Sequence, residues 1–416
     1  MRILHVNKFL YRRGGAEGYM EDVAALQREA GHEVAFWGMD HPENVHTTYE
    51  RFFPRYLEFE PPPPGLKAKA DIAARMLWST SAKRGMAGVI EAFRPDVAHL
   101  HNVYHQLSPS ILRPLAAAGV PAVMTLHDYK LACPTYQFLD HGQPCEACLG
   151  GHFHHAVRRR CKNGSLVSST LAAVELTLHT RTGAYGHIGA FVCPSRFLRD
   201  KMVEAGVYPD RMRHIPHFVD HDGVAPATGP GTGVAFGGRL SPEKGVDTLI
   251  DAVGLDKRLR LRVAGDGPIR AELEERACRV APGRIEFLGR VTKEALADVF
   301  RAAAVVAMPS RWYENQPMTV LEAYGCGRPV VGTALGGTPE LVDDGVDGAL
   351  VPPEDPTALA SALARFTEDP ATAHAMGAVG RGKLAATFAP GIHVQRIDAV
   401  YAEVGARPSP RREARR

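Results

Sequence analysis

Long hydrophobic runs are absent from this 416-residue chain. None approaches the roughly 20 apolar residues that a membrane-spanning helix requires. The opening residues, MRILHVN, read as a buried strand and lack the basic-then-apolar pattern of a signal peptide. These absences predict a cytoplasmic protein.

A strong net charge is also lacking, because the formal charge is only +3 at pH 7. Extensive nucleic-acid binding is therefore not indicated. Basic residues gather only at 158–160 and in the tail at 405–416, which is expected to be disordered. A solvated surface is the plain interpretation of both clusters, and a contact with anionic lipid is the alternative.

Cysteine is scarce, with seven residues, and a cytoplasmic setting argues against disulfides. Four of the seven form a C-x11-C-x2-C-x12-C array, at Cys133, Cys145, Cys148 and Cys161. A close C-x-x-C pair flanked by two further thiols suits a tetrahedral structural zinc site, to which a histidine of 152–155 could contribute. Unligated thiols in an irregular insertion are the alternative. Cys193, Cys278 and Cys326 are expected in the core.

Apolar segments of strand length are plentiful, and they alternate with amphipathic helical patterns almost from end to end. The expected strands are RILHV, EVAFWGM, VAHLHN, PAVMTLHD, GAFVCPS and MRHIPHFV, followed by GVAFGGR, LRLRVAGDG, RIEFLGR, AVVAMPS, RPVVGTA and GALVPP. This alternation predicts an α/β protein with open, mostly parallel sheets. Such sheets bind ligands beyond the carboxyl ends of their strands.

A polar, Gly/Pro-rich segment at 221–233 interrupts this alternation and reads as a linker. It predicts a first domain at 1–220 and a second domain at 234–385, each of ordinary domain size. A C-terminal helix at 386–404 is expected to cross back to the first domain.

The most informative segment carries two glutamates, Glu314 and Glu322, on either side of an expected helix start at Pro317. Proline at the first helical position is already set to the helical φ. The free N–H groups of that first turn, at Met318 and Thr319, would suit a phosphate. The two carboxylates could therefore bracket an elongated, polyhydroxylated, anionic ligand.

Glycine-bearing loops with the right chemistry for phosphate follow three expected strands, at Gly14-Gly15, at 237–245 and at 265–268. Glycines such as Gly238 and Gly267 allow close backbone approach to an anion. Arg239 and Lys244 offer a planar fork and a point charge that could hold a diphosphate. Each loop alone is a weak signal, but the three loops and the two glutamates together are fairly specific.

These motifs resemble those of the retaining, GT-B fold glycosyltransferases of family 4. Gly-Arg-Leu…Lys-Gly at 238–245, Gly-Asp-Gly-Pro at 265–268, E-x7-E at 314–322 and Gly-Gly-x-x-Glu at 336–340 follow the family's order and spacing. The resemblance covers nearly the whole chain and implies two Rossmann-like domains facing across a cleft. It places the chain in a subgroup with a cysteine-rich insertion in the first domain.

The resemblance implies retaining transfer of a sugar from a UDP- or GDP-linked donor to a saccharide, lipid-linked saccharide or natural-product hydroxyl. Arg239 and Lys244 would bind the donor diphosphate, and no metal would be needed because these cations replace it. Glu322 would bind the ribose, Glu314 would contact hydroxyls of the sugar, and His127 would face the sugar. Further donor contacts are expected at Gly14, Gly15, Gly238, Gly267, Val291, Asn315, Gln316, Met318 and Thr319. The family often has Phe-Gly where this chain has AsnGlnProMet, so this stretch is where we expect donor choice to be decided.

Other functions fit the sequence less well. The two glutamates are not expected to approach within the about 5–9.5 Å that a glycoside hydrolase needs. No convincing pyridoxal-phosphate lysine supports a phosphorylase, and no G-x-G-x-x-G follows a strand as a dehydrogenase would need. An inactive nucleotide-sugar-binding protein, with the cysteine segment as a docking module, remains the alternative.

Acceptor-side residues are expected at the carboxyl edge of the first domain, at His101, Asn102, His105 and Asp128. A histidine at such a strand end is more often structural than catalytic. A loop at 59–65 precedes an amphipathic region at 66–93, which by default packs on the first domain. In family members with lipid-linked acceptors the first domain docks on the membrane. Lys67, Lys69, Lys83 and Arg84 are therefore the candidates for a peripheral contact with its inner face.

Overall fold

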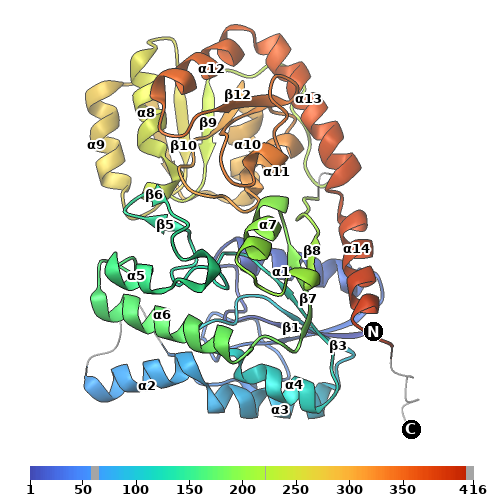
Figure 1. Cartoon of the computed structure of the whole chain (residues 1–416). Helices are drawn as coiled ribbons and strands as arrows, with labels where there is room; N and C mark the ends of the chain where they lie inside the picture. The colour runs from blue at the N-terminus through green and yellow to red at the C-terminus, as the bar shows by residue number, and fades with distance from the viewer. Residues whose placement is uncertain (58–64, 221, 409–416) are drawn as a thin grey trace.

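Two six-stranded parallel sheets organise the chain in the computed structural model, which describes residues 1–57, 65–220 and 222–408 (Figure 1). The first sheet consists of β1 Arg2–Val6, β2 Glu33–Trp37, β3 Val97–Leu100, β4 Ala122–Thr125, β7 Ile188–Cys193 and β8 Met212–His214. The second consists of β9 Val234–Gly237, β10 Leu261–Ala264, β11 Ile285–Gly289, β12 Val305–Met308, β13 Val330–Thr333 and β14 Gly348–Val351. Every strand expected from the sequence is present, so the α/β prediction is confirmed.

The strand orders are β2-β1-β3-β4-β7-β8 and β11-β10-β9-β12-β13-β14. In both sheets the chain starts in the interior and reverses direction across the sheet, as in doubly wound folds, where ligands bind at the point of reversal. That point lies between β1 and β3 in the first sheet and between β9 and β12 in the second.

Helices connect the strands of both sheets (Figure 1). Those of the first half are α1 Gly15–Glu29, α2 Leu66–Leu77, α3 Thr80–Phe93, α4 Leu112–Ala117, α5 His154–Arg158, α6 Leu166–Arg181 and α7 Arg196–Glu204. Those of the second half are α8 Val246–Leu255, α9 Arg270–Val280, α10 Lys293–Ala302, α11 Met318–Gly325, α12 Pro356–Glu368, α13 Pro370–Thr387 and α14 Pro390–Glu403. A short antiparallel hairpin, β5 Leu139–Asp140 and β6 Gln143–Pro144, lies in the cysteine segment.

Local signals explain several helix starts. Ser195 caps α7 by accepting the N–H of Leu198. Asp355 and Asp369 cap α12 and α13, and a proline follows each aspartate at the first helical position. The amphipathic region at 66–93 is two helices, α2 and α3, because Ser79 caps a new helix after Trp78.

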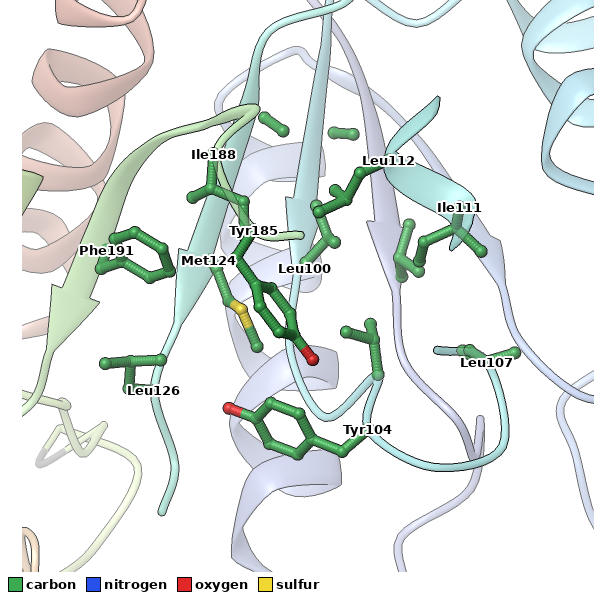
Figure 2. Packing of buried hydrophobic residues seen from close by; sticks show 14 of the residues in the cluster. Leu100, Tyr104, Leu107, Ile111, Leu112, Met124, Leu126, Tyr185, Ile188 and Phe191 are labelled. Carbon is green, nitrogen blue, oxygen red and sulfur yellow. The ribbon is translucent and has the colours of Figure 1, made fainter. Parts of the chain in front are cut away.

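Strand residues of the first sheet meet apolar side chains from the connecting segments to form a core (Figure 2). Leu100, Met124 and Phe191 come from β3, β4 and β7, and all three are fully buried. Burial on this scale stabilises each such side chain by about 1.5–3 kcal/mol and fixes the strand ends that carry polar groups.

The last helix belongs spatially to the first domain. Ile397, Val400 and Tyr401 of α14 pack on Ile3 and Val123 of the first sheet, and α14 lies beside that domain in Figure 1. The expected domain boundary at 385 falls inside α13, because that helix continues to Thr387.

Several expectations from the sequence fall outside the described residues or need correction. Most of the loop at 59–65 and of the tail at 405–416 lies outside the described residues. Cys278 was expected in the core, but it is exposed on α9, whereas Cys193 and Cys326 are buried. Across the described ranges, no helix combines the length and apolarity needed to cross a bilayer.

Candidate active site

The loops that follow β9 and β10 lie against each other at the carboxyl edge of the second sheet. A Cβ on Gly265 would be 1.8 Å from the carbonyl oxygen of Gly238, and one on Gly267 would be 2.2 Å from that of Leu240. The N–H of Leu240 donates to the carbonyl of Asp266 at 2.9 Å. Only glycine permits this backbone contact, which brings the two loops to one place.

Lys244 forms an ion pair with Glu314. Its Nζ lies 2.7 Å from the Glu314 Oε1, which also accepts a hydrogen bond from Ser310 Oγ at 2.6 Å. Burial raises the pKa of the Glu314 carboxyl, but the charge and hydrogen bond of Lys244 and the Ser310 hydroxyl outweigh it and leave the pKa lowered. Glu314 is therefore ionised at neutral pH although it is buried.

Arg239 is the second cation of this edge. Its side chain is exposed, and no ion pair or side-chain hydrogen bond engages it within the described ranges. Its guanidinium is thus available to an anion. Lys244, in contrast, must leave Glu314 to bind an anion, or contact both at once.

The first turn of α11 also faces this edge. Pro317 is the N-cap and Met318 the first helical residue, so the expected position of Pro317 inside the helix was wrong by one residue. Thr319 Oγ1 donates to the carbonyl of Gly237 at 3.3 Å, which ties the helix start to the end of β9. In the described part of the chain, the N–H groups of Met318 and Thr319 have no backbone partner.

Glu322 lies further along α11 and is half-buried. Burial raises the pKa of its carboxyl, and the nearby charge of Lys293 opposes this. No hydrogen bond or ion pair of this carboxylate occurs among the described residues. A partly desolvated acceptor of this kind is suited to the hydroxyl groups of a ligand.

Two glycines after β13 hold the Glu314 segment in place. A Cβ on Gly337 would be 1.8 Å from the carbonyl oxygen of Asn315, and the N–H of Gly337 donates to the carbonyl of Glu314 at 2.7 Å. Gly336 has φ +62°, and a Cβ on it would be 2.6 Å from the carbonyl oxygen of Glu314. The Gly-Gly-x-x-Glu motif is therefore a backbone support for the glutamate before α11.

The side chains of Asn315 and Gln316 join the two domains. Asn315 accepts from Ser195 Oγ at 2.9 Å and donates to the carbonyl of Leu126 at 3.2 Å. Gln316 exchanges hydrogen bonds with the backbone N–H and carbonyl of His217, at 2.6 and 3.3 Å. Both amides are thus engaged by protein groups, and a role for AsnGlnProMet in donor choice stays a prediction.

The first domain brings His127 and Asp128 to this interface, at the end of β4. Both are half-buried, and burial lowers the pKa of His127 to about 3. Burial also raises the pKa of Asp128 to about 6, against the N–H of Lys130 and the charge of Lys8. The His127 ring lies 5.5 Å from that of His217, at the start of the segment between the domains.

The other acceptor-side candidates are tied into the first domain. The backbone N–H of Asn102 donates to Asn7 Oδ1 at 2.9 Å. His105 Nδ1 lies 3.0 Å from the buried Glu175, which also pairs with buried Lys130 at 2.9 Å. This nitrogen of His105 is therefore occupied by a carboxylate, and His101 is fully buried.

Gly14 and Gly15 form the start of α1, with Gly14 as an extended N-cap. A Cβ on Gly15 would meet nothing within 4 Å. Val291 is half-buried just after β11. Gly14 and Gly15 lie in the connection between β1 and α1, and Val291 lies just after β11, so their contacts with a donor stay a prediction.

Lys8 was missed by the sequence analysis. Burial lowers the pKa of its amine, while Asp128 and Glu17 oppose this, so it lies among the charges of the first-domain edge. A charged residue two positions after β1 could have been found by the strand-end rule that was applied to the glycine loops.

The four cysteines of the array lie in one neighbourhood. Burial and the nearby thiols raise the pKa of Cys148 to about 12. Burial, the charge of Asp140 and the nearby thiols raise the pKa of Cys161 to about 12. Among the described residues, however, no three of their sulfur atoms lie within 4.8 Å of one another.

The two doubly wound domains face each other with the carboxyl ends of their strands, where cations and free amides could bind an anion. This arrangement defines a GT-B type of architecture. Residues 13–222 match the family described as Glycosyltransferase Family 4, and residues 231–369 match that described as Glycosyl transferases group 1. The chain therefore belongs to the family 4 and group 1 glycosyltransferases. The expected subgroup with a cysteine-rich insertion stays a prediction.

Curated relatives match over part of their length. A D-inositol 3-phosphate glycosyltransferase of Streptomyces griseus is 35% identical over 206 residues, covering 42% of this chain and 43% of the relative. An alpha-D-kanosaminyltransferase of Streptomyces kanamyceticus is 30% identical over 177 residues, covering 41% and 46%. These matches span less than half of each relative.

Solved structures match over nearly the whole chain. Sucrose-phosphate synthase from Thermosynechococcus elongatus superposes with a TM-score of 0.69 at 19% identity, covering 97% of this chain and 98% of that one. Anabaena HepE in complex with UDP-glucose gives 0.65 at 19% identity, covering 97% and 100%. At this identity the likeness shows the shared GT-B fold.

Proposed function

We propose that this protein is a retaining glycosyltransferase that moves a sugar from a UDP- or GDP-linked donor to a hydroxyl of a saccharide, lipid-linked saccharide or natural product. The observation that carries the proposal is the convergence of Arg239, Lys244 and the first turn of α11 at one sheet edge. Two cations and free amides suit a diphosphate. A HepE structure with UDP-glucose, of the same fold, supports a nucleotide-sugar donor.

The chemistry follows from charge. As the bond between sugar and phosphate loosens, negative charge gathers on the leaving diphosphate. Arg239, Lys244 and the α11 amides stabilise this charge more in the transition state than in the ground state, which is what accelerates the step. Because these groups supply the positive charge, catalysis needs no metal.

Retention follows if the acceptor hydroxyl attacks the face from which the diphosphate departs. The hydroxyl proton then passes to a phosphate oxygen of the leaving group, so the protein need supply no nucleophile. Glu314 holds hydroxyls of the transferred sugar, and Glu322 accepts from the ribose hydroxyls. The acceptor enters from the edge that carries His127 and Asp128.

A donor panel tests this function. The chain is incubated with UDP-glucose, UDP-galactose, UDP-N-acetylglucosamine, GDP-mannose and GDP-fucose, and free UDP or GDP is followed. Slow release of nucleotide from at least one donor is expected even without an acceptor. Binding of a nucleotide, detected by a thermal shift, without release or transfer from any donor would contradict the proposal and favour an inactive binding protein.

We propose a structural zinc ion for the four cysteines Cys133, Cys145, Cys148 and Cys161. Four thiols are a soft ligand set suited to zinc, and the sulfur atoms would have to draw closer than they lie here. Elemental analysis of the purified chain should find about one zinc ion per molecule, lost in a Cys145→Ser and Cys148→Ser double variant. A metal-free purified protein would contradict this.

A peripheral membrane contact is a further proposal. Helix α6 exposes Val167, Val174 and Leu178 at 78%, 49% and 42%, and exposed Lys67 lies on the adjacent α2. Lys83 and Arg84 are also exposed, and the side chain of Lys69 lies outside the described residues. Exposed apolar residues beside a lysine favour anionic lipid.

Sedimentation with phosphatidylglycerol vesicles tests the contact. A Val174→Glu and Leu178→Glu double variant should release the protein from the vesicles. Val379→Glu, which changes a valine of equal exposure on α13, should not. Equal sedimentation of both variants would refute the contact.

A further inference from the structure

A row of buried side chains extends from His127 into the first domain. His127 Nε2 lies 3.1 Å from His101 Nδ1, and His101 Nε2 lies 3.0 Å from His5 Nδ1. His5 Nε2 lies 2.7 Å from Gln27 Oε1. His5, His101 and Gln27 have no exposed surface, so each polar atom in the row depends on its neighbour.

The strand register builds this row. His5 on β1 pairs with His99 on β3, and alternation along β3 brings His101 to the same face of the sheet. Gln27 comes from α1, which covers that face. With His127 after β4, the four side chains of the row come from four segments of the chain, so no single sequence motif could predict it.

The imidazole rings meet end to end. The His5 and His101 ring centres are 5.3 Å apart with planes 15° apart, and those of His101 and His127 are 5.3 Å apart with planes 29° apart. Centres this far apart, with nitrogens about 3 Å apart, mean that each contact is nearly in line with both rings. That is the geometry of a straight N–H···N hydrogen bond.

The hydrogen bonds of the row all have the same donor-to-acceptor direction. Burial lowers the pKa of His5 to about 4 and that of His101 well below its ordinary value, so both rings are neutral. A neutral imidazole donates from one nitrogen and accepts at the other. Because the Gln27 oxygen can only accept, His5 donates to it, His101 donates to His5, and His127 donates to His101.

The amide of Gln27 is also bonded on its other side. Its Nε2 donates to Tyr401 of α14 at 3.0 Å. The Tyr401 hydroxyl then donates to His99 Nδ1 at 2.6 Å, and His99 Nε2 donates to Thr125 Oγ1 at 2.7 Å. Every donor in this extension has an acceptor, so the direction is the same throughout.

The same histidines do not suit a metal. Nitrogens of His5, His99 and His101 lie within 4.8 Å of one another. The facing nitrogens of His5 and His101 already share a proton, and both nitrogens of His99 have partners. A metal would have to displace these hydrogen bonds.

We propose that Gln27, His5 and His101 are positioning residues that hold His127 in the tautomer with its proton on Nε2. The Nδ1 of His127 is then a fixed hydrogen-bond acceptor at the domain interface. Within the described chain no protein group bonds to it. Resting on the proposed glycosyltransferase function, its ligand is a hydroxyl of the bound sugar, and a sugar lacking that hydroxyl is discriminated against.

Nitrogen NMR of histidine-labelled protein tests the proposal without any turnover. The His127 resonances are identified by their loss in His127→Gln. We expect an unprotonated Nδ1 and a protonated Nε2 in the wild type, at pH 7 and without ligand. A protonated Nδ1 would mean that the row runs the other way and would overturn the inference, whether or not the chain transfers sugar.

Two substitutions of Gln27 separate positioning from structure. Gln27→Met removes the terminal acceptor, so both His127 tautomers should appear. Gln27→Glu keeps an acceptor for His5 and should restore the single tautomer. Gln143→Met, the same substitution at an exposed glutamine of the cysteine segment outside this network, is the control and should leave the His127 tautomer unchanged. A single Nε2–H tautomer in folded Gln27→Met would overturn the inference.

Activity gives an independent readout once a donor is known. Loss of one oriented hydrogen bond should lower kcat/KM of Gln27→Met about five- to tenfold, and Gln27→Glu should recover it. Equal losses in both variants would show that Gln27 acts only through the fold.

Discussion

The pair formed by Lys244 and Glu314 shows how single residues prepare this site. A buried carboxylate is costly unless it is paired, and Lys244 and Ser310 supply the compensation. In the proposed function, a diphosphate that binds Arg239 would compete with Glu314 for Lys244. The carboxylate is then released toward the hydroxyls of the transferred sugar, as the proposed roles of both residues require.

Five buried histidines should make the stability of the protein depend on pH: His5, His99, His101, His217 and His393. Burial lowers the pKa of all five, to about 4 for His5 and His393. The unfolded chain therefore binds more protons than the native one below about pH 6.5. Stability is fully present above that pH and falls as the pH drops toward the native values, by up to about 1.4 kcal/mol per histidine for each pH unit.

Denaturant titrations at pH 7.5, 6.5 and 5.5 measure this effect. Asp128 acts in the opposite sense, because its pKa of about 6 means that the native state holds one extra proton between about pH 4 and 6. The five histidines outnumber it, so the free energy of unfolding should decrease from pH 6.5 to 5.5. An unchanged free energy of unfolding would contradict the inference that these rings are buried in their neutral form.

Residue types and spacing predicted the two cations of the candidate site, because Arg239 and Lys244 stand in a recognisable loop after a strand. They did not reveal that Asn315 and Gln316 bind protein groups of the other domain and the connecting segment. Those partners, Ser195, Leu126 and His217, are distant in sequence, and only the folded chain brings them near.

At the scale of elements, glycines decide how closely the strand-end loops can approach. Gly337→Ala should displace the segment with Glu314, since the new Cβ would lie 1.8 Å from the carbonyl oxygen of Asn315. A shift of about 1 Å in a positioned group lowers turnover roughly a hundredfold. Donor turnover and the melting temperature measure this effect.

The matched control is Gly382→Ala in the interior of α13, where a Cβ would meet nothing within 4 Å. It should leave turnover unchanged and raise stability by about 0.5–1 kcal/mol. Full activity in Gly337→Ala would show that the Gly-Gly motif does not position Glu314.

Alternating apolar and helical patterns were sufficient for both sheets, because parallel strands buried on two faces leave a strong signal. The same patterns did not predict the hairpin of β5 and β6, because each of these strands has only two residues. Elements that short carry no periodicity.

At the scale of the whole molecule, polar contacts hold the two domains together. Glu340, after β13, accepts the N–H groups of Arg196 and Phe197 in the first turn of α7, at 2.8 and 2.6 Å. A carboxylate at a helix N-terminus is stabilised by the free amides and the helix dipole. Gln143 of the cysteine segment also donates to Glu354 of the second domain at 2.9 Å.

Glu340→Ala should loosen this domain contact at a cost of about 1–3 kcal/mol. Without nucleotide, small-angle scattering should then show a larger radius of gyration for the variant than for the wild type. With nucleotide bound, the two radii should differ less. Glu275→Ala, at an exposed glutamate on α9, should scatter like the wild type. Identical profiles for all three proteins would refute a role of Glu340 in domain closure.

The central claim is that Arg239 and Lys244 carry the charge of the departing diphosphate. The direct test is the single-turnover rate of nucleotide release at saturating donor, in Arg239→Ala and Lys244→Ala, with exposed Lys257→Ala as the control. Arg239 is exposed and unpaired in the described chain, so a lower rate in Arg239→Ala cannot be attributed to unfolding. We predict rates lower by about 10²- to 10³-fold in both variants, with donor affinity changed far less, and a normal rate in the control. Rates that equal the wild type, or losses that appear only in donor affinity, would contradict the account.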